Sequence, residues 1–346
     1  MPKIAILGTT SWGTTLGIVL ARKGMRVSLW GRTEEESEAL EQTRVNRDLL
    51  PGISFPKRLS VSAGLSETLS GAVLTILAVP AQRLRTNIRQ AADYLEPSTM
   101  VMSAAKGLEM GSGLRMSEVI AEEIPSPCHA GICVISGPNL AREIAQGLPA
   151  ATVVAARDMK VARQAGNLLA SRNLGVFLNT DMVGVELGGA LKNIIALGAG
   201  ISDGLSLGDN AKAALITRGW AEIMALGVAM GADPLTFSGL AGLGDLVATC
   251  ASPLSRNHYV GSELASGRSL DDILAGMSGV AEGVDTTRVA RQLSRKLRVD
   301  MPITDLIYRI LFEGLAPDRA LSHLKALIRP RHELGGLASH SAMPKL

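Results

Sequence analysis

A single lysine stands in the middle of a long apolar stretch of the chain. The stretch Val183–Ile201 contains little besides apolar and very small residues, which is typical of a buried helix. Lys192 is near its centre, and Gly188 and Gly189, one turn earlier, leave room beside the ammonium group for a ligand or another backbone segment. Burial disfavours the charged form of a lysine and lowers its pKa toward the range useful for proton transfer. Lys192 is therefore a candidate proton donor and acceptor, although a lysine that extends to the surface of a domain would fit the same pattern.

A carboxylate later in the chain could balance this charge. Asp245 follows the glycine-rich segment Ser238–Gly244, which we interpret as a turn-rich surface. A buried lysine is costly unless it is paired with an opposite charge. Asp245 is therefore the candidate partner of Lys192.

The segment after Asp245 contains a candidate anion site. Ser252 and Pro253 precede a helical run, and Ser is favoured at a helix N-cap and Pro in the first helical turn. Arg256 and Asn257 at that position could join the helix N-terminus in binding an anion. A plain capped helix with an exposed arginine would have the same sequence.

The N-terminal segment carries a glycine pattern between an expected strand and an expected helix. Ile4–Leu7 is followed by a turn that runs from Gly8 to Gly13, and then by a helix. This order is the setting of a dinucleotide fingerprint, in which helix N–H groups face a pyrophosphate. Thr10 stands where the pattern asks for a second glycine, so its side chain lies where the backbone should approach the phosphates. An ordinary strand-to-helix turn, with Trp12 as the first apolar helix residue, is the alternative.

The second expected strand ends next to an arginine. Arg26–Trp30 is followed by Gly31 and Arg32, where an NAD enzyme often has an acid for the ribose 2′-hydroxyl. Arg32 instead suits a 2′-phosphate or stacking on an adenine. A solvent-facing loop arginine is the alternative.

The order of predicted elements changes near residue 179. Before it, short β-rich runs alternate with helical stretches, which predicts an α/β domain with a parallel sheet covered on both faces. After it, helices follow one another and are separated by Gly and Pro. We therefore predict a dinucleotide-binding domain over residues 1–179, an all-helical substrate domain over 180–329 and a polar tail over 330–346. The predicted strands are Ile4–Leu7, Arg26–Trp30, Val73–Val79, Thr99–Ser103, Ile132–Ser136, Thr152–Ala156 and Gly175–Leu178. The predicted helices are Gly13–Lys23, Glu34–Asn46, Ala81–Tyr94, Met116–Glu123, Leu140–Gln146, Val161–Ser171, Val183–Ile201, Asn210–Met230, Ser255–Ala265, Leu270–Ala275, Asp285–Leu297 and Thr304–Glu313.

Composition narrows the class of protein. With 346 residues, of which 47% are hydrophobic and 19% charged, the chain can bury a sizeable interior over roughly two domains. The net charge of +3, without a long basic block, favours solvated helix faces over a nucleic-acid partner. We expect no secretory segment and no membrane span, because no uncharged apolar run approaches ~20 residues. The 3 cysteines and 5 histidines lack metal-ligand spacing, so we expect reduced thiols, a cytoplasmic protein and no metal.

Taken together, these segments resemble the bacterial NAD(P)-dependent glycerol-3-phosphate dehydrogenases. The resemblance runs from Ile4 to about Ile328 and is most specific within Gly184–Asn257, at Gly188–Asn193, Asp203–Gly204, Gly208–Ala213 and Ser252–Asn257. It implies an N-terminal Rossmann-type domain with a doubly wound sheet, followed by an all-α domain like the C-terminal domain of 6-phosphogluconate dehydrogenase. The implied reaction interconverts dihydroxyacetone phosphate and sn-glycerol 3-phosphate with NADPH or NADH and without a metal. That reaction would supply glycerol 3-phosphate for phospholipid synthesis.

The resemblance also implies roles for individual residues. Lys192 is the implied proton donor and acceptor, and Lys106, within Ser103–Glu109, contacts both ligands. The implied substrate contacts are Lys106, Gly137, Asn139, Lys192, Asp245, Ser255, Arg256 and Asn257. The implied cofactor contacts are Gly8, Ser11, Trp12, Gly13, Arg32, Lys106, Ala141, Arg256, Val280 and Glu282.

The chain departs from the family pattern at two positions. Thr10 replaces the usual glycine, and Asn139 stands where Ser or Thr is common, although its amide can still donate to a substrate oxygen. Two other functions remain open at this point. One is a dehydrogenase of the same superfamily that acts on a hydroxy or keto acid, because a carboxylate would also suit Arg256. The other is a dinucleotide-binding protein without turnover. An apolar helical domain also favours a homodimer.

Overall fold

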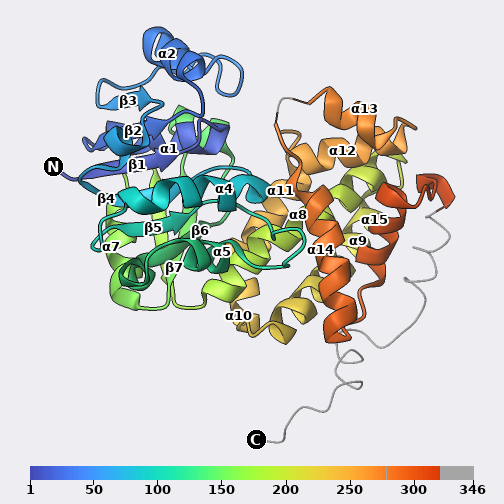
Figure 1. Ribbon diagram of the computed structural model, residues 1–346. Coiled ribbons are helices and arrows are strands. Elements are labelled where there is room, and N and C mark those ends of the chain that lie inside the picture. Colours follow the sequence, from blue (N-terminus) through green and yellow to red (C-terminus); the bar gives the residue numbers. More distant parts are fainter. Residues whose placement is uncertain (278, 320–346) are drawn as a thin grey trace, which may run out of the picture.

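The computed structural model of the chain describes residues 1–277 and 279–319, and it has two parts (Figure 1). The N-terminal part is an eight-stranded sheet with helices packed on both faces, and the C-terminal part is helical. The predicted fold class, a Rossmann-type α/β domain followed by an all-α domain, is confirmed. The predicted tail, residues 330–346, lies outside the described residues, as does the end of the predicted helical domain.

The sheet has the strand order β3-β2-β1-β4-β5-β6-β7-β8. Its strands are β1 (Lys3–Leu7), β2 (Arg26–Trp30), β3 (Leu59–Ser62), β4 (Ala72–Leu77), β5 (Met100–Ser103), β6 (Ile132–Ser136), β7 (Ala150–Ala156) and β8 (Leu174–Asn179). The order reverses between β1 and β4, and a doubly wound sheet binds ligands in the crevice at such a point. The turn after β1 therefore lies where the fold places a nucleotide.

The sheet differs from the prediction in two respects. Strand β3 was not predicted, because its four residues alternate Leu and Val with serines and carry only a weak β signal. The sheet is also not wholly parallel, since β6 pairs with β7 in antiparallel register, with Cys133 opposite Ala156. A strand that is buried on both faces has the same apolar composition whether it runs parallel or antiparallel to its neighbour. The sequence therefore did not show that β7 runs antiparallel to β6.

The helices of the N-terminal part agree with the prediction to within a few residues. They are α1 (Ser11–Arg22), α2 (Glu34–Thr43), α3 (Leu65–Leu69), α4 (Ala81–Ala91), α5 (Met116–Glu123), α6 (Ala141–Gln146) and α7 (Met159–Leu169), with 3₁₀ turns η1 (Ala92–Tyr94) and η2 (Ser126–Gly131). The short helix α3 was not predicted. Helix α1 begins at Ser11, two residues before the predicted start, because Thr10 caps it.

The helical part contains α8 (Met182–Gly204), α9 (Asp209–Ala229), α10 (Pro234–Phe237), α11 (Asp245–Ala251), α12 (Arg256–Ala265), α13 (Leu270–Ala275), α14 (Glu282–Leu297) and α15 (Pro302–Phe312), with a short π-helical segment η3 (Leu240–Gly244). Helices α10 and α11 and the segment η3 were not predicted. The interpretation of Ser238–Gly244 as a turn-rich surface holds only for part of the segment: Ser238, Gly239 and Leu243 are exposed, whereas Ala241 and Gly242 are buried. Gly242 allows close packing, because a Cβ there would lie 2.2 Å from the carbonyl oxygen of Phe237.

Helix α8 is the central element of the helical part and lies where the two parts meet (Figure 1). By length and mean hydropathy it could cross a membrane, as could the stretch Pro234–Ala251. However, 89% of the apolar window of α8 is buried inside the protein, as in the core helix of a globular domain. Its apolar character is therefore explained by packing against its neighbours.

Glycines bring α8 and α12 into close contact. A Cβ on Gly200 of α8 would lie 2.0 Å from the carbonyl oxygen of His258, and one on Gly261 of α12 would lie 2.1 Å from that of Leu197. No other residue allows the two backbones to approach so closely. This crossing holds the N-terminus of α12 beside the middle of α8, where Lys192 lies.

Candidate functional site

Two lysines share one buried aspartate at the junction of the two parts. Lys192 Nζ donates to Asp245 Oδ1 at 2.7 Å, and Lys106 Nζ donates to Asp245 Oδ2 at 2.7 Å. Lys192 is 5% exposed and Asp245 is 2% exposed, so Lys192 does not extend to the surface. Lys192 also binds the hydroxyl of Thr249, one turn after Asp245 on α11. The suggested pairing of Lys192 with Asp245 is present in the structure.

Each member of this cluster comes from a different element. Lys192 is on α8, Asp245 begins α11, and Lys106 is in the loop after β5. Lys106 Nζ also donates to the carbonyl oxygen of Gly137, in the turn after β6, at 2.8 Å. Gly189 makes the meeting possible, because a Cβ there would lie 2.2 Å from the Oγ of Ser136. Three segments of the chain thus place one negative and two positive charges within hydrogen-bond distance.

Burial sets the titration of Lys192. Loss of solvation lowers its pKa to about 8, against the attraction of Asp245, which raises it. The ammonium of Lys106 lowers it further. A lysine with this pKa is populated in both protonation states near neutral pH, as a group that donates and accepts protons must be.

The N-terminus of α12 carries three of the predicted substrate contacts. The Ser255 hydroxyl caps the helix and accepts from the backbone N–H of His258 at 3.2 Å, while Arg256 is solvent-exposed. The buried Asn257 amide donates to Asn193 Oδ1 at 2.9 Å and accepts from the Gly283 N–H at 2.9 Å. Asn257 therefore ties α8, α12 and α14 together next to Lys192, so its contacts within the protein are structural.

The turn after β1 has the geometry expected of a dinucleotide turn. Gly8 has φ +114°, and a Cβ there would lie 2.7 Å from the Ala78 carbonyl oxygen. A Cβ on Gly13 would lie 2.1 Å from the Gly8 carbonyl oxygen, so α1 approaches β1 as closely as backbone allows. The Thr10 hydroxyl donates to Ala78 O at 2.6 Å and accepts from Gly13 N at 3.1 Å. Thr10 is thus accommodated as the cap of α1.

Glu282 links the start of α4 to the loop that carries Lys106. Its Oε1 accepts from the Ala81 N–H, at the start of α4, at 3.0 Å. A Cβ on Gly107, next to Lys106, would lie 3.3 Å from its Oε2. Burial raises the pKa of Glu282 to about 7, and its Oε2 has no hydrogen-bond partner within the described residues. An orphaned buried oxygen between the start of α4 and the loop of Lys106 fits a polar group of a bound cofactor.

The remaining predicted cofactor contacts and the predicted substrate contact Asn139 make few contacts with one another. Arg32 is exposed just after β2, and the Ala141 carbonyl, at the start of α6, accepts from the Thr15 hydroxyl of α1 at 3.1 Å. Trp12 Nε1 is buried without a partner within the described residues. Ser11 is the first residue of α1, and Val280 is partly exposed two residues before Glu282. Asn139 donates to the Thr152 hydroxyl at 3.1 Å, and its own Oδ1 is buried without a described partner.

Three residues of the site were not among the candidates from the sequence. Thr249, Asn193 and Ser136 touch the lysine cluster or its supports. Thr249 is four residues after Asp245, so a predicted helix over 245–251 would have placed both on one face. Nothing in the spacing of Ser136 indicates its contact with α8. Within residues 1–277 and 279–319, no group of three or more His, Cys, Asp or Glu side chains could hold a metal.

Comparison with known proteins identifies the family. The models for the N-terminus and the C-terminus of NAD-dependent glycerol-3-phosphate dehydrogenase match residues 3–162 and 181–322. A glycerol-3-phosphate dehydrogenase (NAD(P)+) of Dehalococcoides mccartyi is 57% identical over 337 residues, which cover 97% of this chain and 94% of that protein. One from Streptomyces griseus is 49% identical over 322 residues, with 93% and 96% covered.

A solved structure agrees with this result. The crystal structure of the glycerol-3-phosphate dehydrogenase of Coxiella burnetii is 37% identical, has a TM-score of 0.88 and is matched over 95% of this chain and 99% of that one. Both halves of the family are thus present here in order, on the same fold and over nearly the full length of the relatives. The chain belongs to the NAD-dependent glycerol-3-phosphate dehydrogenase family.

Proposed function

We propose that the chain interconverts dihydroxyacetone phosphate and sn-glycerol 3-phosphate with NADPH or NADH. The observation that carries the proposal is the Lys106–Asp245–Lys192 cluster, next to which Asn193 of α8 accepts from Asn257 at the N-terminus of α12. A ketone held there would have a proton donor and positive charge at its oxygen. The family membership of the chain supports the same reaction.

The residues of the cluster have distinct proposed tasks. When bound at the turn of Gly8 and Gly13, with Glu282 nearby, the nicotinamide cofactor supplies the hydride. Lys192 donates its Nζ proton to the ketone oxygen as that oxygen gains negative charge, and in the reverse direction its neutral amine accepts the proton from the hydroxyl. Lys106 adds a second positive charge beside the developing alkoxide. Asp245 holds both ammonium groups in place.

The substrate phosphate is proposed to bind at the N-terminus of α12. This end of a ten-residue helix offers backbone N–H groups and a partial positive charge, and Arg256 is its first residue. A guanidinium can form hydrogen bonds to two phosphate oxygens at once. The lysines of the cluster would meanwhile bind the ketone oxygen, so the phosphate needs a separate site. Binding energy from the phosphate would then orient the ketone.

The requirement for the phosphate tests this proposal. We expect dihydroxyacetone to be reduced with at least about a hundredfold lower kcat/KM than dihydroxyacetone phosphate, because it lacks the charge-assisted contacts. Arg256→Lys should raise the KM for the phosphorylated substrate by about tenfold or more, since a point charge replaces the fork. Initial rates with both substrates give these values.

The control for this experiment is Arg268→Lys, beyond the other end of α12. Arg268 pairs with Glu263 at 2.5 Å on the surface, so its replacement should leave both rates unchanged. Equal efficiency with and without the phosphate would instead indicate a dehydrogenase that acts on another hydroxy or keto compound. Binding of reduced cofactor without turnover of either substrate would indicate a non-catalytic protein.

Cofactor preference is expected to depend on Arg32. The enzyme should use NADPH at least as well as NADH, because an arginine can pair with a 2′-phosphate for about 1.5–3 kcal/mol and can also stack on adenine. Arg32→Asp should reverse the preference by roughly ten- to a hundredfold, since a carboxylate repels the 2′-phosphate and accepts from a free 2′-hydroxyl. The ratio of kcat/KM for the two cofactors measures this effect.

The matched variant for Arg32 is Arg163→Asp, an exposed position on α7. It makes the same change of charge and should leave the cofactor ratio as it is. A parent enzyme that strongly prefers NADH, with a ratio unmoved by Arg32→Asp, would place Arg32 outside the cofactor site.

The cellular setting is part of the proposal. All three cysteines, Cys128, Cys133 and Cys250, are buried free thiols, which fits the reducing environment of the cytoplasm. We infer that the protein acts there on small molecules as a homodimer and supplies glycerol 3-phosphate for phospholipid synthesis.

A further inference from the structure

The loop that follows β5 carries Lys106 and joins the two parts of the molecule. It runs from Ala104 to Arg115, and Arg115 Nη1 binds Glu186 Oε2 of α8 at 2.5 Å. Between these ends, the side chain of Leu108 is fully buried in the apolar core of the helical part. The loop is therefore anchored in the helical part on both sides of its tip.

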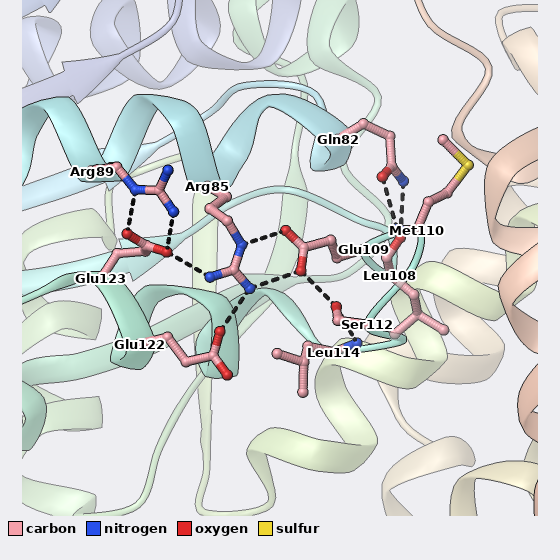
Figure 2. A network of polar contacts seen from close by, with 10 residues as sticks. All are labelled: Gln82, Arg85, Arg89, Leu108, Glu109, Met110, Ser112, Leu114, Glu122 and Glu123. Atoms are coloured by element: carbon pink, nitrogen blue, oxygen red, sulfur yellow. Dashed lines mark hydrogen bonds and ion pairs between the residues drawn. The ribbon is translucent and has the colours of Figure 1, made fainter.

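Two side chains of α4 hold the same loop from the sheet domain (Figure 2). Gln82 Nε2 donates to the Leu108 carbonyl oxygen at 2.9 Å, and Gln82 Oε1 accepts from the Met110 N–H at 2.9 Å. Arg85, nearly one turn later, binds both carboxylate oxygens of Glu109, at 2.7 and 2.8 Å. Three successive loop residues, 108–110, are thus bound to one face of α4.

Arg85 is itself held from a second direction. Its guanidinium also binds Glu122 at 2.7 Å and Glu123 at 2.5 Å, at the end of α5, as Figure 2 shows. The hydrogen bond to Glu109 raises the pKa of Arg85 and lowers that of Glu109. Hydrogen bonds from Arg89 and Arg85 lower the pKa of Glu123 to about 2. These groups therefore stay charged across the neutral and mildly alkaline range.

We propose that Gln82, Arg85 and Glu109, which we name the α4 clamp, are positioning residues that hold the ammonium of Lys106 against Asp245. This inference rests on the proposed function, because it assigns the clamp a purpose in the reaction. Glu109 is only three residues after Lys106. Because the backbone at residues 108–110 is bound to α4, the position of the Lys106 Cα is restricted as well. Without the clamp, the lysine has many rotamers and only the partners at its tip to restrict them.

The position of Lys106 has a consequence that can be measured at Lys192. The titratable groups that face Lys192 are Asp245 and Cys250 from α11 and Lys106 from the loop. The Lys106 ammonium lowers the pKa of Lys192, and Lys106 also shares the Asp245 carboxylate. If Lys106 moves away, the repulsion between the two ammonium groups decreases, and the Asp245 carboxylate interacts with Lys192 alone. Both changes raise the pKa of Lys192.

The test compares Arg85→Gln with Arg89→Gln in the full-length enzyme. Arg89 is on the same helix, 65% exposed, and binds Glu123 without touching the loop. For Arg85→Gln we expect the KM for dihydroxyacetone phosphate to rise about tenfold. In the pH profile of kcat/KM for reduction, the alkaline limb should shift to higher pH by about half a unit or more. Arg85→Lys should restore part of both values, because it keeps the charge, and Arg89→Gln should change neither.

A merely structural role predicts a different result. If Arg85→Gln lowers only the melting temperature, with KM and the alkaline limb equal to those of Arg89→Gln, the clamp does not position Lys106. Glu109→Gln is an isosteric second variant that removes the same ion pair, and it decides the question if Arg85→Gln does not fold. A downward or absent shift of the limb in Glu109→Gln overturns the proposal.

Hydrogen exchange separates this inference from the proposed reaction. Amides of residues 104–110 should exchange faster in Arg85→Gln than in the parent, and at parent rates in Arg89→Gln. This measurement needs no substrate, so an enzyme inactive on dihydroxyacetone phosphate would refute the reaction without refuting the clamp. Unchanged exchange over residues 104–110 in both clamp variants would refute the clamp alone.

Discussion

Lys192→Met is expected to reduce the turnover of dihydroxyacetone phosphate by about 10²–10⁴-fold, because the variant lacks the general acid and the charge at the developing alkoxide. Cofactor binding should remain close to that of the parent, since Lys192 is on α8 of the helical part and no described contact joins it to the glycine turn. Steady-state rates and titration with reduced cofactor measure the two effects separately.

The pH dependence of the parent supplies a second part of this prediction. Reduction needs the ammonium, so its kcat/KM should fall as the pH rises through about 8, the pKa of Lys192 in the free enzyme. Oxidation needs the neutral amine, so its kcat/KM should rise through the same pH. The residual activity of Lys192→Met should show neither the fall for reduction nor the rise for oxidation near this pH. Lys160→Met, at an exposed position on α7, is the control; more than half of normal activity in Lys192→Met would contradict the assignment.

Asp245→Asn is expected to have the second-largest effect. The substitution leaves two ammonium groups without their shared carboxylate in a buried site, and breaking a buried pair costs on the order of 3 kcal/mol. A misplaced Lys192 and Lys106 should reduce kcat/KM by about a hundredfold or more. Denaturant unfolding and initial rates measure the two losses.

The alkaline limb of reduction should shift in opposite directions in Asp245→Asn and in the variants of the α4 clamp. Attraction by Asp245 raises the pKa of Lys192, so its removal should move the alkaline limb of reduction below about 8. Loosening Arg85 should move the same limb upward. Asp93→Asn, an exposed position in η1, is the control and should leave the profile unchanged. An Asp245→Asn variant with the parent's profile would show that Lys192 is not the titrating group.

Much of the fold was determined by local sequence. The alternation of apolar runs and helical stretches before residue 179, and their replacement by helices after it, were sufficient for the fold class. The burial of the helix that carries Lys192 also followed from the apolar residues around it. Such features depend on periodicity and composition within one element, which the sequence displays directly.

The tertiary structure decided which elements meet. Lys106 and Asp245 are 139 residues apart in the chain, and their contact depends on how α11 packs against α8 and on the loop after β5. The antiparallel return of β7 and the burial of Ala241 and Gly242 likewise depend on packing partners. A glycine permits a loop or a close helix crossing equally well, so its role is set by what lies opposite.

The α4 clamp illustrates the same limit at the level of charge. Arg85, Glu109 and Glu123 each have the composition of a solvated helix face or loop. Nothing in their spacing distinguishes them within the chain's 35 Lys and Arg and 32 Asp and Glu residues. Only the folded arrangement brings one guanidinium between three carboxylates. The sequence indicated that Lys192 lies in a buried helix, because that follows from its own apolar neighbours, but only the structure shows that its side chain is buried as well. Its partners come from packing between distant elements, because hydrogen bonds depend on distances that no local pattern encodes.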